Sequence, residues 1–276
     1  MASSFAGLTL DRPRLMGIVN VTPDSFSDGG LYFRPETAIA HGRSLMSQGA
    51  DILDVGGEST RPGAAPVSVE EEFRRVIPVV RALVAEGALV SVDTRHAAVM
   101  KGALAAGARI VNDITALEGD AGSLPAVAGS GASVVLMHMR GEPGTMQDDP
   151  RYDDVVAEVF GYLADRVDAC RSAGIPPERI AVDPGIGFGK TVDHNLALVA
   201  GLERFAELGC ALLLGVSRKS FIGRLSRGEP PTDRLPGSLA AALAGVARGA
   251  HVLRVHDVAD TAQALAVWTR LAATGS

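Results

Sequence analysis

The stretch Leu89-Val-Ser-Val-Asp-Thr-Arg-His-Ala-Ala-Val-Met-Lys-Gly-Ala-Leu-Ala-Ala-Gly-Ala-Arg-Ile-Val-Asn-Asp113 contains one complete unit of the fold. A short apolar run, Leu89 to Val92, is followed by a helical pattern from His96 to Ala106 and by a second run, Arg109 to Val111. Gly107 stands where the helix should end, a position at which glycine enters the left-handed region cheaply. Short strands joined through a helix lie parallel in one sheet, so the stretch predicts a strand–helix–strand unit.

The same unit recurs along the whole chain of 276 residues. Strands are predicted at Leu15 to Val21, Ile52 to Val55, Leu89 to Val92, Arg109 to Val111, Ser133 to Met137, Ile180 to Val182, Ala211 to Val216 and Val252 to Val255. Helices are predicted at Glu36 to Gln48, Val69 to Glu86, His96 to Ala106, Ser123 to Gly131, Asp153 to Ala173, Leu196 to Leu208, Leu235 to Ala247 and Ala259 to Leu271. Glycines mark the expected helix ends at Gly49, Gly87, Gly107, Gly131, Gly174, Gly209 and Gly249.

These patterns select a fold class. Continuous rather than alternating apolar strands indicate a parallel sheet covered by helices on its outer face. Eight such units close a barrel, and about 250 residues is a common size for one barrel domain. No linker or charge block divides the chain, so we expect a single (β/α)8 TIM-barrel domain over 1–276. An open doubly wound sheet is the alternative, but it has no obvious use for eight equal units.

The composition argues against several classes of protein. The formal net charge is −6 and no run of Lys or Arg occurs, so we expect no nucleic-acid partner. The N-terminus lacks the features of a secretory signal, and no apolar run reaches the roughly 18 residues of a membrane span. Cys170 and Cys210 show no metal-binding or CxxC spacing. We therefore expect a cytoplasmic protein without membrane association, whose two cysteines are small buried hydrophobes.

A polar residue stands at or just after the end of every predicted strand. In chain order these residues are Asn20, Asp54 with Glu58, Asp93, Asn112 with Asp113, His138, Asp183, Arg218 with Lys219, and Arg254 with His256. One such residue can merely cap the next helix, but eight in register are hard to explain as caps. The carboxyl ends of barrel strands all lie at one face, where active sites occur in this fold. The sequence therefore predicts an active site at that face.

Cationic groups gather after the last two strands. Ser220, which follows Arg218 and Lys219, is placed to begin a helix whose free N–H groups attract an anion. Arg254 and His256 stand two apart on a strand, so both side chains should face the same side. Phosphate sites after strands seven and eight recur in this fold. The residues of these loops therefore predict that the protein binds a small molecule that carries phosphate groups.

The remaining polar residues leave some alternatives open. His138 is either a satisfied core histidine or a functional group, whereas Arg254 nearby favours an anion-binding role for His256. The long first loop, 20–30, is either an ordinary surface connection or a cover for the site. No Gly-x-Ser-x-Gly elbow or nucleophilic cysteine is visible. The carboxylates of Asp93 and Asp183 could accept hydrogen bonds from the ring N–H and amino groups of a heterocycle.

Eight segments occur together in a specific order. They are Met16-Gly-Ile-Val-Asn-Val-Thr-Pro-Asp-Ser-Phe-Ser-Asp-Gly-Gly30, Asp54-Val-Gly-Gly-Glu-Ser-Thr-Arg-Pro-Gly63, Ser91-Val-Asp-Thr94, Val111-Asn-Asp-Ile114, Met137-His-Met139, Asp183-Pro-Gly-Ile-Gly-Phe-Gly-Lys190, Ser217-Arg-Lys-Ser-Phe-Ile-Gly223 and Arg254-Val-His-Asp-Val258. Each segment alone is weakly informative, but together they make the chain resemble the dihydropteroate synthase family of the folate pathway. The resemblance spans essentially the whole chain, from Met16 to Val258.

The resemblance implies a reaction and a role for each matching residue. 6-Hydroxymethyl-7,8-dihydropterin diphosphate and 4-aminobenzoate would give 7,8-dihydropteroate and diphosphate. The pterin side would comprise Asp93, Asn112, Met137, Asp183, Gly215, Lys219 and Arg254. The diphosphate would be held by Arg254 and His256, with Asn20 coordinating its Mg²⁺, and Val255 between them would also bind substrate. The aminobenzoate side would comprise Thr60, Arg61, Pro62, Phe188 and Ser220, with Phe26 and Asp28 closing the first loop. The catalytic groups would be Lys219, Arg254, His256 and Arg61.

The resemblance also implies a cofactor and partners. Mg²⁺ would be the cofactor and a homodimer the assembly. Sulfonamides would inhibit, because the Thr60-Arg61-Pro62 segment and the first loop are intact. A methyltetrahydrofolate-dependent corrinoid methyltransferase is one alternative, but it has no use for a diphosphate clamp. A catalytically silent pterin-binding homologue is another, and the complete first and second loops argue against it.

Overall fold

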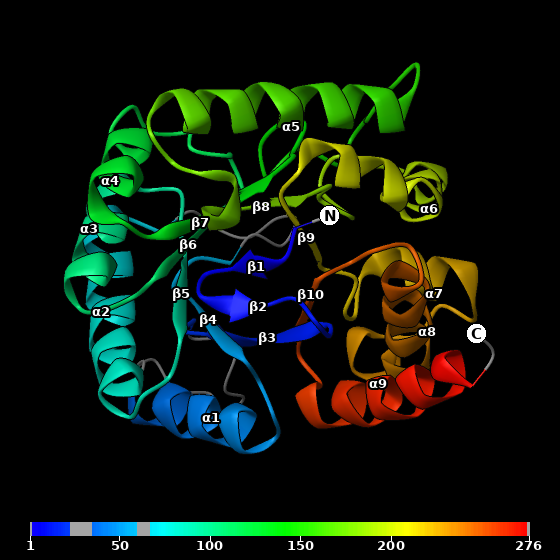
Figure 1. Cartoon of the computed structure of the whole chain (residues 1–276), viewed down its shortest axis with the longest axis horizontal. Helices are drawn as coiled ribbons and strands as arrows, with labels where there is room; N and C mark the ends of the chain where they lie inside the picture. The colour runs from blue at the N-terminus through cyan, green and yellow to red at the C-terminus, as the bar shows by residue number, and fades with distance from the viewer. Residues whose placement is uncertain (1, 23–34, 60–66, 275–276) are drawn as a thin grey trace.

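The computed structural model describes residues 2–22, 35–59 and 67–274. Eight parallel strands close into a barrel in the order β10-β3-β4-β5-β6-β7-β8-β9, and β1 pairs with β2 in a separate antiparallel hairpin (Figure 1). The strands are β1 Ser4–Phe5, β2 Leu8–Thr9, β3 Arg14–Asn20, β4 Ile52–Gly56, β5 Val90–Asp93, β6 Ile110–Asp113, β7 Ser133–Met137, β8 Ile180–Asp183, β9 Ala211–Leu214 and β10 Val252–Val255. The predicted (β/α)8 TIM barrel is confirmed, and the open-sheet alternative is wrong.

Helices form a ring outside the strands in Figure 1. The α-helices are α1 Pro35–Ser47, α2 Val69–Ala85, α3 Ala97–Ala105, α4 Ser123–Ser130, α5 Val155–Ser172, α6 Val192–Ala200, α7 Ser220–Leu225, α8 Leu235–Val246 and α9 Val258–Ala273. Short 3-10 helices are η2 Pro177–Arg179, η3 Leu202–Leu208 and η4 Pro231–Asp233. The glycines expected at the helix ends all have positive φ, at Gly49, Gly87, Gly107, Gly131, Gly174, Gly209 and Gly249. In the described ranges, no helix is long and apolar enough to cross a membrane.

Two local features differ from the sequence prediction. The segment predicted as one helix over Leu196 to Leu208 is split, because α6 ends at Ala200 and η3 follows after Gly201. Glycine destabilises a helix interior, and Gly201, which has φ −93° and ψ 16°, is the residue at which α6 ends. The β1–β2 hairpin was not predicted at all. Its strands have only two residues each and are joined through Ala6 and Gly7, with φ of 53° and 81°.

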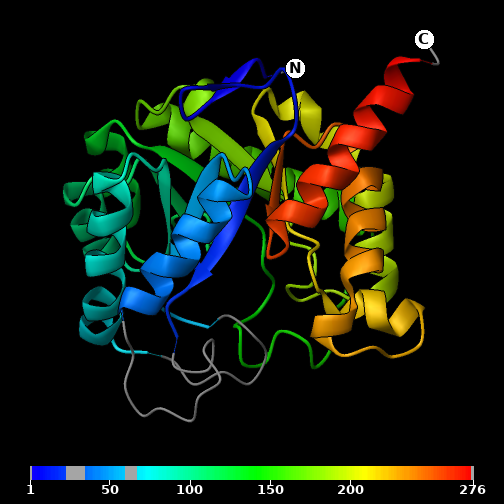
Figure 2. The ribbon, with the colours of Figure 1, turned by 90° about the horizontal axis from the view of Figure 1, so that it is seen from below.

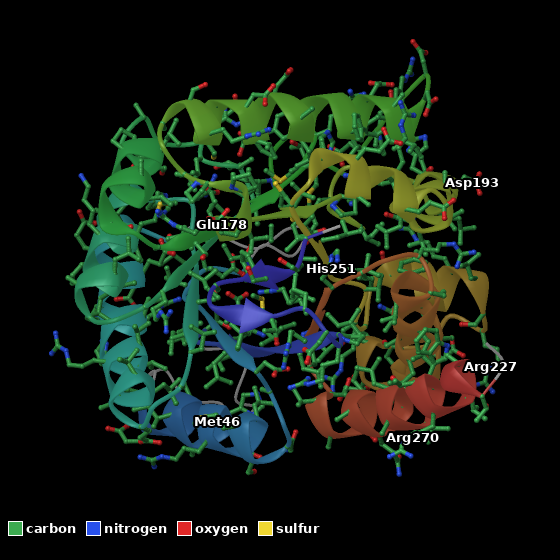
Figure 3. The ribbon with its side chains drawn as sticks, in the orientation of Figure 1. Met46, Glu178, Asp193, Arg227, His251 and Arg270 are labelled. Atoms are coloured by element: carbon green, nitrogen blue, oxygen red, sulfur yellow. The ribbon has the colours of Figure 1, made fainter. Side chains whose placement is uncertain are left out.

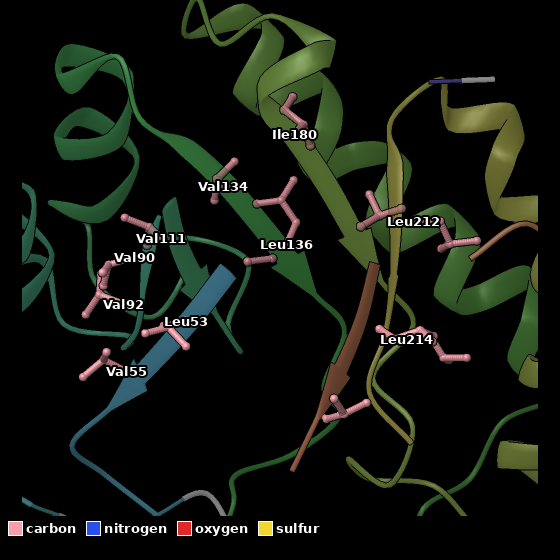
Figure 4. Close-up of a cluster of buried hydrophobic side chains, with 14 of the residues drawn as sticks. Leu53, Val55, Val90, Val92, Val111, Val134, Leu136, Ile180, Leu212 and Leu214 are labelled. Atoms are coloured by element: carbon pink, nitrogen blue, oxygen red, sulfur yellow. The ribbon is translucent and has the colours of Figure 1, made fainter. Parts of the chain in front are cut away.

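Alternation along each strand separates two apolar layers. Leu53, Val92, Leu136 and Leu214 belong to the layer between strands and helices, and several members of this layer are drawn in Figure 4. The residues between them point into the barrel, because successive side chains of a strand face opposite sides. The inner layer is filled by Phe5, Met16, Ile52, Ile110, Val135, Ala181, Ala211, Leu213 and Val252.

The N-terminal hairpin closes one end of the barrel. Phe5 is fully buried and packs with the inner layer near the strand beginnings. The C-terminal part of α9 also points toward this side of the molecule in Figure 2. His251, labelled in Figure 3, immediately precedes β10 and its Nδ1 accepts a hydrogen bond of 3.1 Å from the Leu212 N–H. The opposite end, where the strands finish, is left to polar inward-facing residues.

Candidate active site

The inward positions at the strand ends carry the polar residues that the sequence singled out. Asp93 of β5 lies beside Asn112 of β6 in the sheet register, and Met137 of β7 lies beside Asp183 of β8. A Cβ built on Gly215 would lie 3.9 Å from both Arg254 Cβ and an Asp183 carboxylate oxygen. The strands therefore bring these side chains to one mouth of the barrel. We call Asp54, Asp93, Asn112, Asp183, Lys219 and Arg254 the strand-end cluster.

Arg254 is the central cation of this cluster. Its Nε donates to Asp54 Oδ2 at 2.6 Å, and its Nη2 donates to Asp93 Oδ2, also at 2.6 Å. The Arg254 side chain keeps 23% of its surface exposed, whereas that of Asp54 is fully buried. Burial lowers the pKa of Arg254, but the charges of Asp54 and Asp93 outweigh burial, so that the pKa is raised overall. The guanidinium therefore stays charged at the site.

Asp93 is a carboxylate whose pKa lies close to neutral pH. Burial and the neighbouring charge of Asp54 outweigh the attraction of Arg254 and raise the pKa of Asp93 to about 7. Burial also raises the pKa of Asp183, whose Oδ1 accepts a 2.8 Å hydrogen bond from the Gly185 N–H. Two carboxylates with raised pKa values thus face the same mouth of the barrel.

Lys219 contributes the second cation, from the turn between β9 and α7. Its Nζ lies 4.0 Å from the centre of the Phe188 ring, which is a cation–π distance. Burial and the nearby charge of Arg254 lower the pKa of Lys219 to about 8. Gly187 allows this approach, since a Cβ there would lie 3.2 Å from the Lys219 side chain and its φ is +83°.

His138 is a core histidine, which resolves one alternative left open by the sequence. It is buried, and its Nδ1 lies 3.0 Å from Lys190 Nζ. Lys190 also donates to the carbonyl oxygens of His138 and Phe188, at 3.3 and 2.9 Å. Burial and the charge of Lys190 lower the pKa of His138 to about 3. This pair ties the loop after β7 to the loop after β8.

His256 and Arg218 belong to a second set of contacts after β9 and β10. Ser217 Oγ lies 3.0 Å from His256 Nδ1 and accepts a 3.2 Å hydrogen bond from the His256 N–H. The Arg218 guanidinium pairs with Asp257, its Nε donating to Asp257 Oδ2 at 2.9 Å. Arg218 has φ 59°, a strained value for a residue other than glycine. These contacts fix the backbone that carries Lys219 and Ser220.

The other sequence-predicted residues divide into three groups. Ser220 is exposed at the start of α7, and Asn20 is half-buried at the end of β3. The side chain of Val255 is buried in the outer apolar layer, so only the backbone of this residue can face the site. Residues of the first two loops lie outside the described residues, namely Phe26, Asp28, Thr60, Arg61 and Pro62.

Sequence reasoning missed two contributors to this geometry. Asp54 was noted only as a polar strand end, although its position two residues after the inward Ile52 signals that it faces the barrel interior. Lys190 enters the sequence analysis only as the last residue of the Asp183–Lys190 segment, whereas the structure shows it 2% exposed and in contact with His138. No local pattern links Lys190 to a histidine 52 positions away.

The comparisons with known proteins agree with this geometry. A family model described as pterin binding enzyme matches residues 16–256. A dihydropteroate synthase of Neisseria meningitidis serogroup B is 53% identical over 268 residues, which cover 95% of this chain and 94% of that protein.

Two solved structures are similar along nearly their whole length. The Xanthomonas albilineans dihydropteroate synthase with 4-aminobenzoic acid has a TM-score of 0.91 and 55% identity, covering 96% of this chain and 95% of its own. The Yersinia pestis enzyme with a sulfonamide drug also has a TM-score of 0.91, at 44% identity, and the match covers 97% of this chain and 98% of that one. The chain belongs to the dihydropteroate synthase family of pterin-binding enzymes.

Proposed function

We propose that this chain condenses 6-hydroxymethyl-7,8-dihydropterin diphosphate with 4-aminobenzoate, giving 7,8-dihydropteroate and diphosphate. The observation that carries the proposal is the strand-end cluster. It places the acceptors Asp93, Asn112 and Asp183 beside the cations Lys219 and Arg254 at one mouth of the barrel. A heterocycle rich in N–H donors that also carries a diphosphate needs both kinds of group.

The acceptors are suited to the pterin ring. Asp183 keeps Oδ2 on the side of Gly215 while Oδ1 is occupied by the Gly185 N–H. Asn112 directs its amide nitrogen to Asp54, which leaves its carbonyl oxygen free to accept. Ionised Asp93 adds a further acceptor. Ring N–H and amino donors would satisfy these oxygens, which would otherwise lack partners once the substrate has displaced water.

The cations are suited to the leaving group. As the pterin methylene C–O bond breaks, its electron pair stays on the diphosphate, and negative charge grows there. Positive groups fixed beforehand stabilise that charge without having to reorganise. We assign this role to Arg254 and Lys219, with His256 held by Ser217 at the end of β10.

Mg²⁺ fits the site through Asn20. Its side chain makes no hydrogen bond to any described residue, so its amide oxygen is available at the end of β3. Oxygen is the ligand that Mg²⁺ prefers, and this ion commonly binds through one or two protein groups together with substrate phosphates. The described parts of the chain hold no cluster of three His, Cys, Asp or Glu side chains that would bind a metal without substrate. Bound there, Mg²⁺ would neutralise charge on the diphosphate.

Bond cleavage can run ahead of attack in this reaction. The electron-rich pterin stabilises a methylene cation, and the neutral amino group of 4-aminobenzoate then donates its electron pair to that carbon. The new C–N bond forms, and the nitrogen releases one proton to solvent. Deuterium at the pterin methylene should therefore give a normal secondary isotope effect on the chemical step, because that carbon becomes trigonal. An effect near unity would argue for concerted displacement.

The aminobenzoate side is proposed from the turn after β9 and the loop after β8. Ser220 is exposed at the start of α7, and Phe188 stands beside Lys219. The proposal also includes Thr60, Arg61 and Pro62, with Phe26 and Asp28 above them. Sulfonamides resemble 4-aminobenzoate in shape and charge, so we propose that they compete for the same place. The intact Thr60-Arg61-Pro62 segment supports sensitivity to these drugs.

We further propose that the enzyme is a homodimer. An apolar hollow of about 510 Å³ lies among α6, α7 and α8, and Leu196 and Leu225 at its lining are 41% and 52% exposed. Its rim carries both signs of charge, from Arg227, Glu229, Asp233 and Arg234. A twofold contact places the same patch against itself, so a rim of mixed sign can be self-complementary.

The cellular location is proposed on the cysteines. Cys170 and Cys210 are both buried free thiols, the state that a reducing compartment maintains. Burial also raises the pKa of both thiols to about 11, which keeps them protonated and inert. The cytoplasm is the compartment that we propose.

Aminobenzoate-dependent release of diphosphate tests the function. Purified protein with Mg²⁺ and the pterin diphosphate should release diphosphate only when 4-aminobenzoate is added. Lys219→Ala should lower kcat/KM by about 100-fold, since it removes a charge that stabilises the transition state. Lys101→Ala, on the exposed face of α3, serves as the matched lysine control and should leave turnover unchanged. Binding of the pterin without release would instead support a silent binding protein.

A further inference from the structure

Asp54 touches two proposed substrate-binding residues through one oxygen atom. Its Oδ2 accepts from Arg254 Nε at 2.6 Å and from Asn112 Nδ2 at 3.0 Å. The side chain is fully buried in β4, and its second oxygen, Oδ1, has no hydrogen-bond partner within the described ranges. Leaving a buried carboxylate oxygen unpaired is costly, so this arrangement needs a reason beyond stability.

The first consequence concerns the orientation of Asn112. An amide can present either its nitrogen or its oxygen to a neighbour, and the neighbour decides which. A carboxylate only accepts, so Asp54 selects the Asn112 nitrogen and turns the Asn112 carbonyl oxygen away from itself. Asn112 is 6% exposed, so little water is available to compete for the amide. The amide therefore offers an acceptor to the pocket.

The second consequence concerns Arg254. Asp54 and Asp93 hold different nitrogens of the same guanidinium, Nε and Nη2 respectively. Two contacts on separate nitrogens fix the plane of the guanidinium as well as its position. The carboxylate of Asp54 comes from β4, and Arg254 comes from β10, so the contact spans the barrel interior beside the intervening β3.

We propose that Asp54 is a positioning residue for the pterin half of the reaction, which orients the Asn112 carbonyl oxygen and the Arg254 guanidinium through its single oxygen Oδ2. Asp54 acts through these two residues and need not touch the substrate. The inference rests on the proposed function, because it assigns the pterin to the strand-end cluster.

Asp54 also affects the ionisation of Asp93, which gives a second readout. The charged groups that act on Asp93 come from several elements, namely Arg254 of β10, Asp54 of β4, Glu72 of α2, Asp113 of β6 and Lys219 of the turn after β9. Burial makes the largest contribution to the raised pKa of Asp93, and the negative charge of Asp54 raises that pKa further. Removing that charge would lower the pKa of Asp93.

Asp54→Asn is the sharpest test, because it keeps the shape and one acceptor oxygen but removes the charge. The KM for the pterin diphosphate should rise about tenfold, the size expected when a charge-assisted hydrogen bond is lost. The KM for 4-aminobenzoate should not change. The acidic limb of kcat/KM for the pterin should move to lower pH. Asp54→Ser, whose shorter side chain can reach only one of the two partners, should show a larger rise in the KM for the pterin diphosphate. This variant replaces Asp54→Asn in the test if the Asn variant does not fold.

Asp113→Asn is the matched control, since Asp113 is also a fully buried carboxylate, at the end of β6, which is separated from β4 by β5. Its oxygens accept from Thr115 and Leu117, away from the pterin pocket. Its variant should lose stability without the change in pterin KM. Folded Asp54 variants with the wild-type pterin KM and acidic midpoint would overturn the inference, as would an equal rise in KM for both substrates. Wild-type protein that fails to turn over would overturn the proposed function instead.

Discussion

In the strand-end cluster, the side chains of Asp93 and Lys219 have pKa values close to neutral pH. Burial, together with Asp54, raises the pKa of Asp93 to about 7, and burial, together with Arg254, lowers the pKa of Lys219 to about 8. Asp93 must be ionised to accept from the pterin, and Lys219 must be protonated to stabilise the diphosphate. The two requirements are met together only in a narrow range of pH.

We therefore expect a bell-shaped dependence of kcat/KM for the pterin diphosphate on pH. Activity should fall below about pH 7 as Asp93 gains a proton, and above about pH 8 as Lys219 loses one. Initial rates between pH 5.5 and 9.5, at limiting pterin diphosphate, measure both limbs. Asp93→Asn is the control, and it should remove the acidic limb and lower the maximum. A profile that stays flat from about pH 6 to 9 would contradict these assignments.

Most residues of the cluster could be predicted from the sequence, because each stands at a strand end and strand residues alternate between inside and outside. Asp93, Asn112, Asp183 and Arg254 are in that class. The partner of each residue could not be predicted. Asp54 and Arg254 are 200 positions apart, and only closure of the barrel brings them within 2.6 Å. Local patterns carry no information about such a contact.

At the scale of elements, the β1–β2 hairpin acts as a plug at the end of the barrel opposite the proposed site. Phe5 is 0% exposed and fills the inner layer beside Met16 and Ile110. A two-residue strand has too little sequence to show alternation, which is why the hairpin was not predicted. Its position implies a structural contribution without a catalytic one.

Phe5→Ala should lower the free energy of unfolding by about 3–5 kcal/mol, the range for removing a buried aromatic ring. Both KM values should stay unchanged, because the hairpin lies far from the strand ends. Urea unfolding followed by circular dichroism measures the first effect, and steady-state rates measure the second. Phe73→Ala is the control, since Phe73 on α2 is 41% exposed and should cost much less. Equal losses for the two variants would show that the hairpin does not plug the barrel.

The turn after β9 gives a second prediction at this scale. Arg218 is held at φ 59°, where a residue with a Cβ is strained and glycine is not. Arg218→Gly and Arg218→Ala both lose the contact with Asp257, so their difference isolates the backbone term. The glycine variant should be more stable than the alanine variant by about 1 kcal/mol in urea unfolding. Equal stability would mean that the turn relaxes when the guanidinium is removed.

At the scale of the whole molecule, the fold could be predicted from the sequence more completely than the contacts of single residues. Eight apolar runs with glycines between them were enough to give the barrel, because few topologies accommodate eight equal parallel units. Assembly was not visible in the sequence as a surface stripe, since the residues around the hollow come from α6, α7, η4 and α8. Only the folded chain collects them on one surface.

The proposed dimer should depend on that surface. Leu225→Asp places a charge in the apolar hollow, where pairing with a second copy would have to bury it, so the protein should become monomeric. Light scattering after size-exclusion chromatography measures the mass against the 28.5 kDa chain. Leu271→Asp is the matched control on α9, because Leu271 is 68% exposed and does not line the hollow. Unchanged dimers in the Leu225 variant would place the interface elsewhere.

The most direct test of the account is the stoichiometry of the two products. The purified chain, Mg²⁺, the pterin diphosphate and 4-aminobenzoate are incubated together. In the same samples, 7,8-dihydropteroate is quantified by mass spectrometry, and diphosphate is quantified as phosphate after treatment with an inorganic pyrophosphatase. The account predicts that the two products appear in equal amounts and that both require 4-aminobenzoate. Diphosphate formed without dihydropteroate, or no product from a folded protein that still binds the pterin, would contradict it.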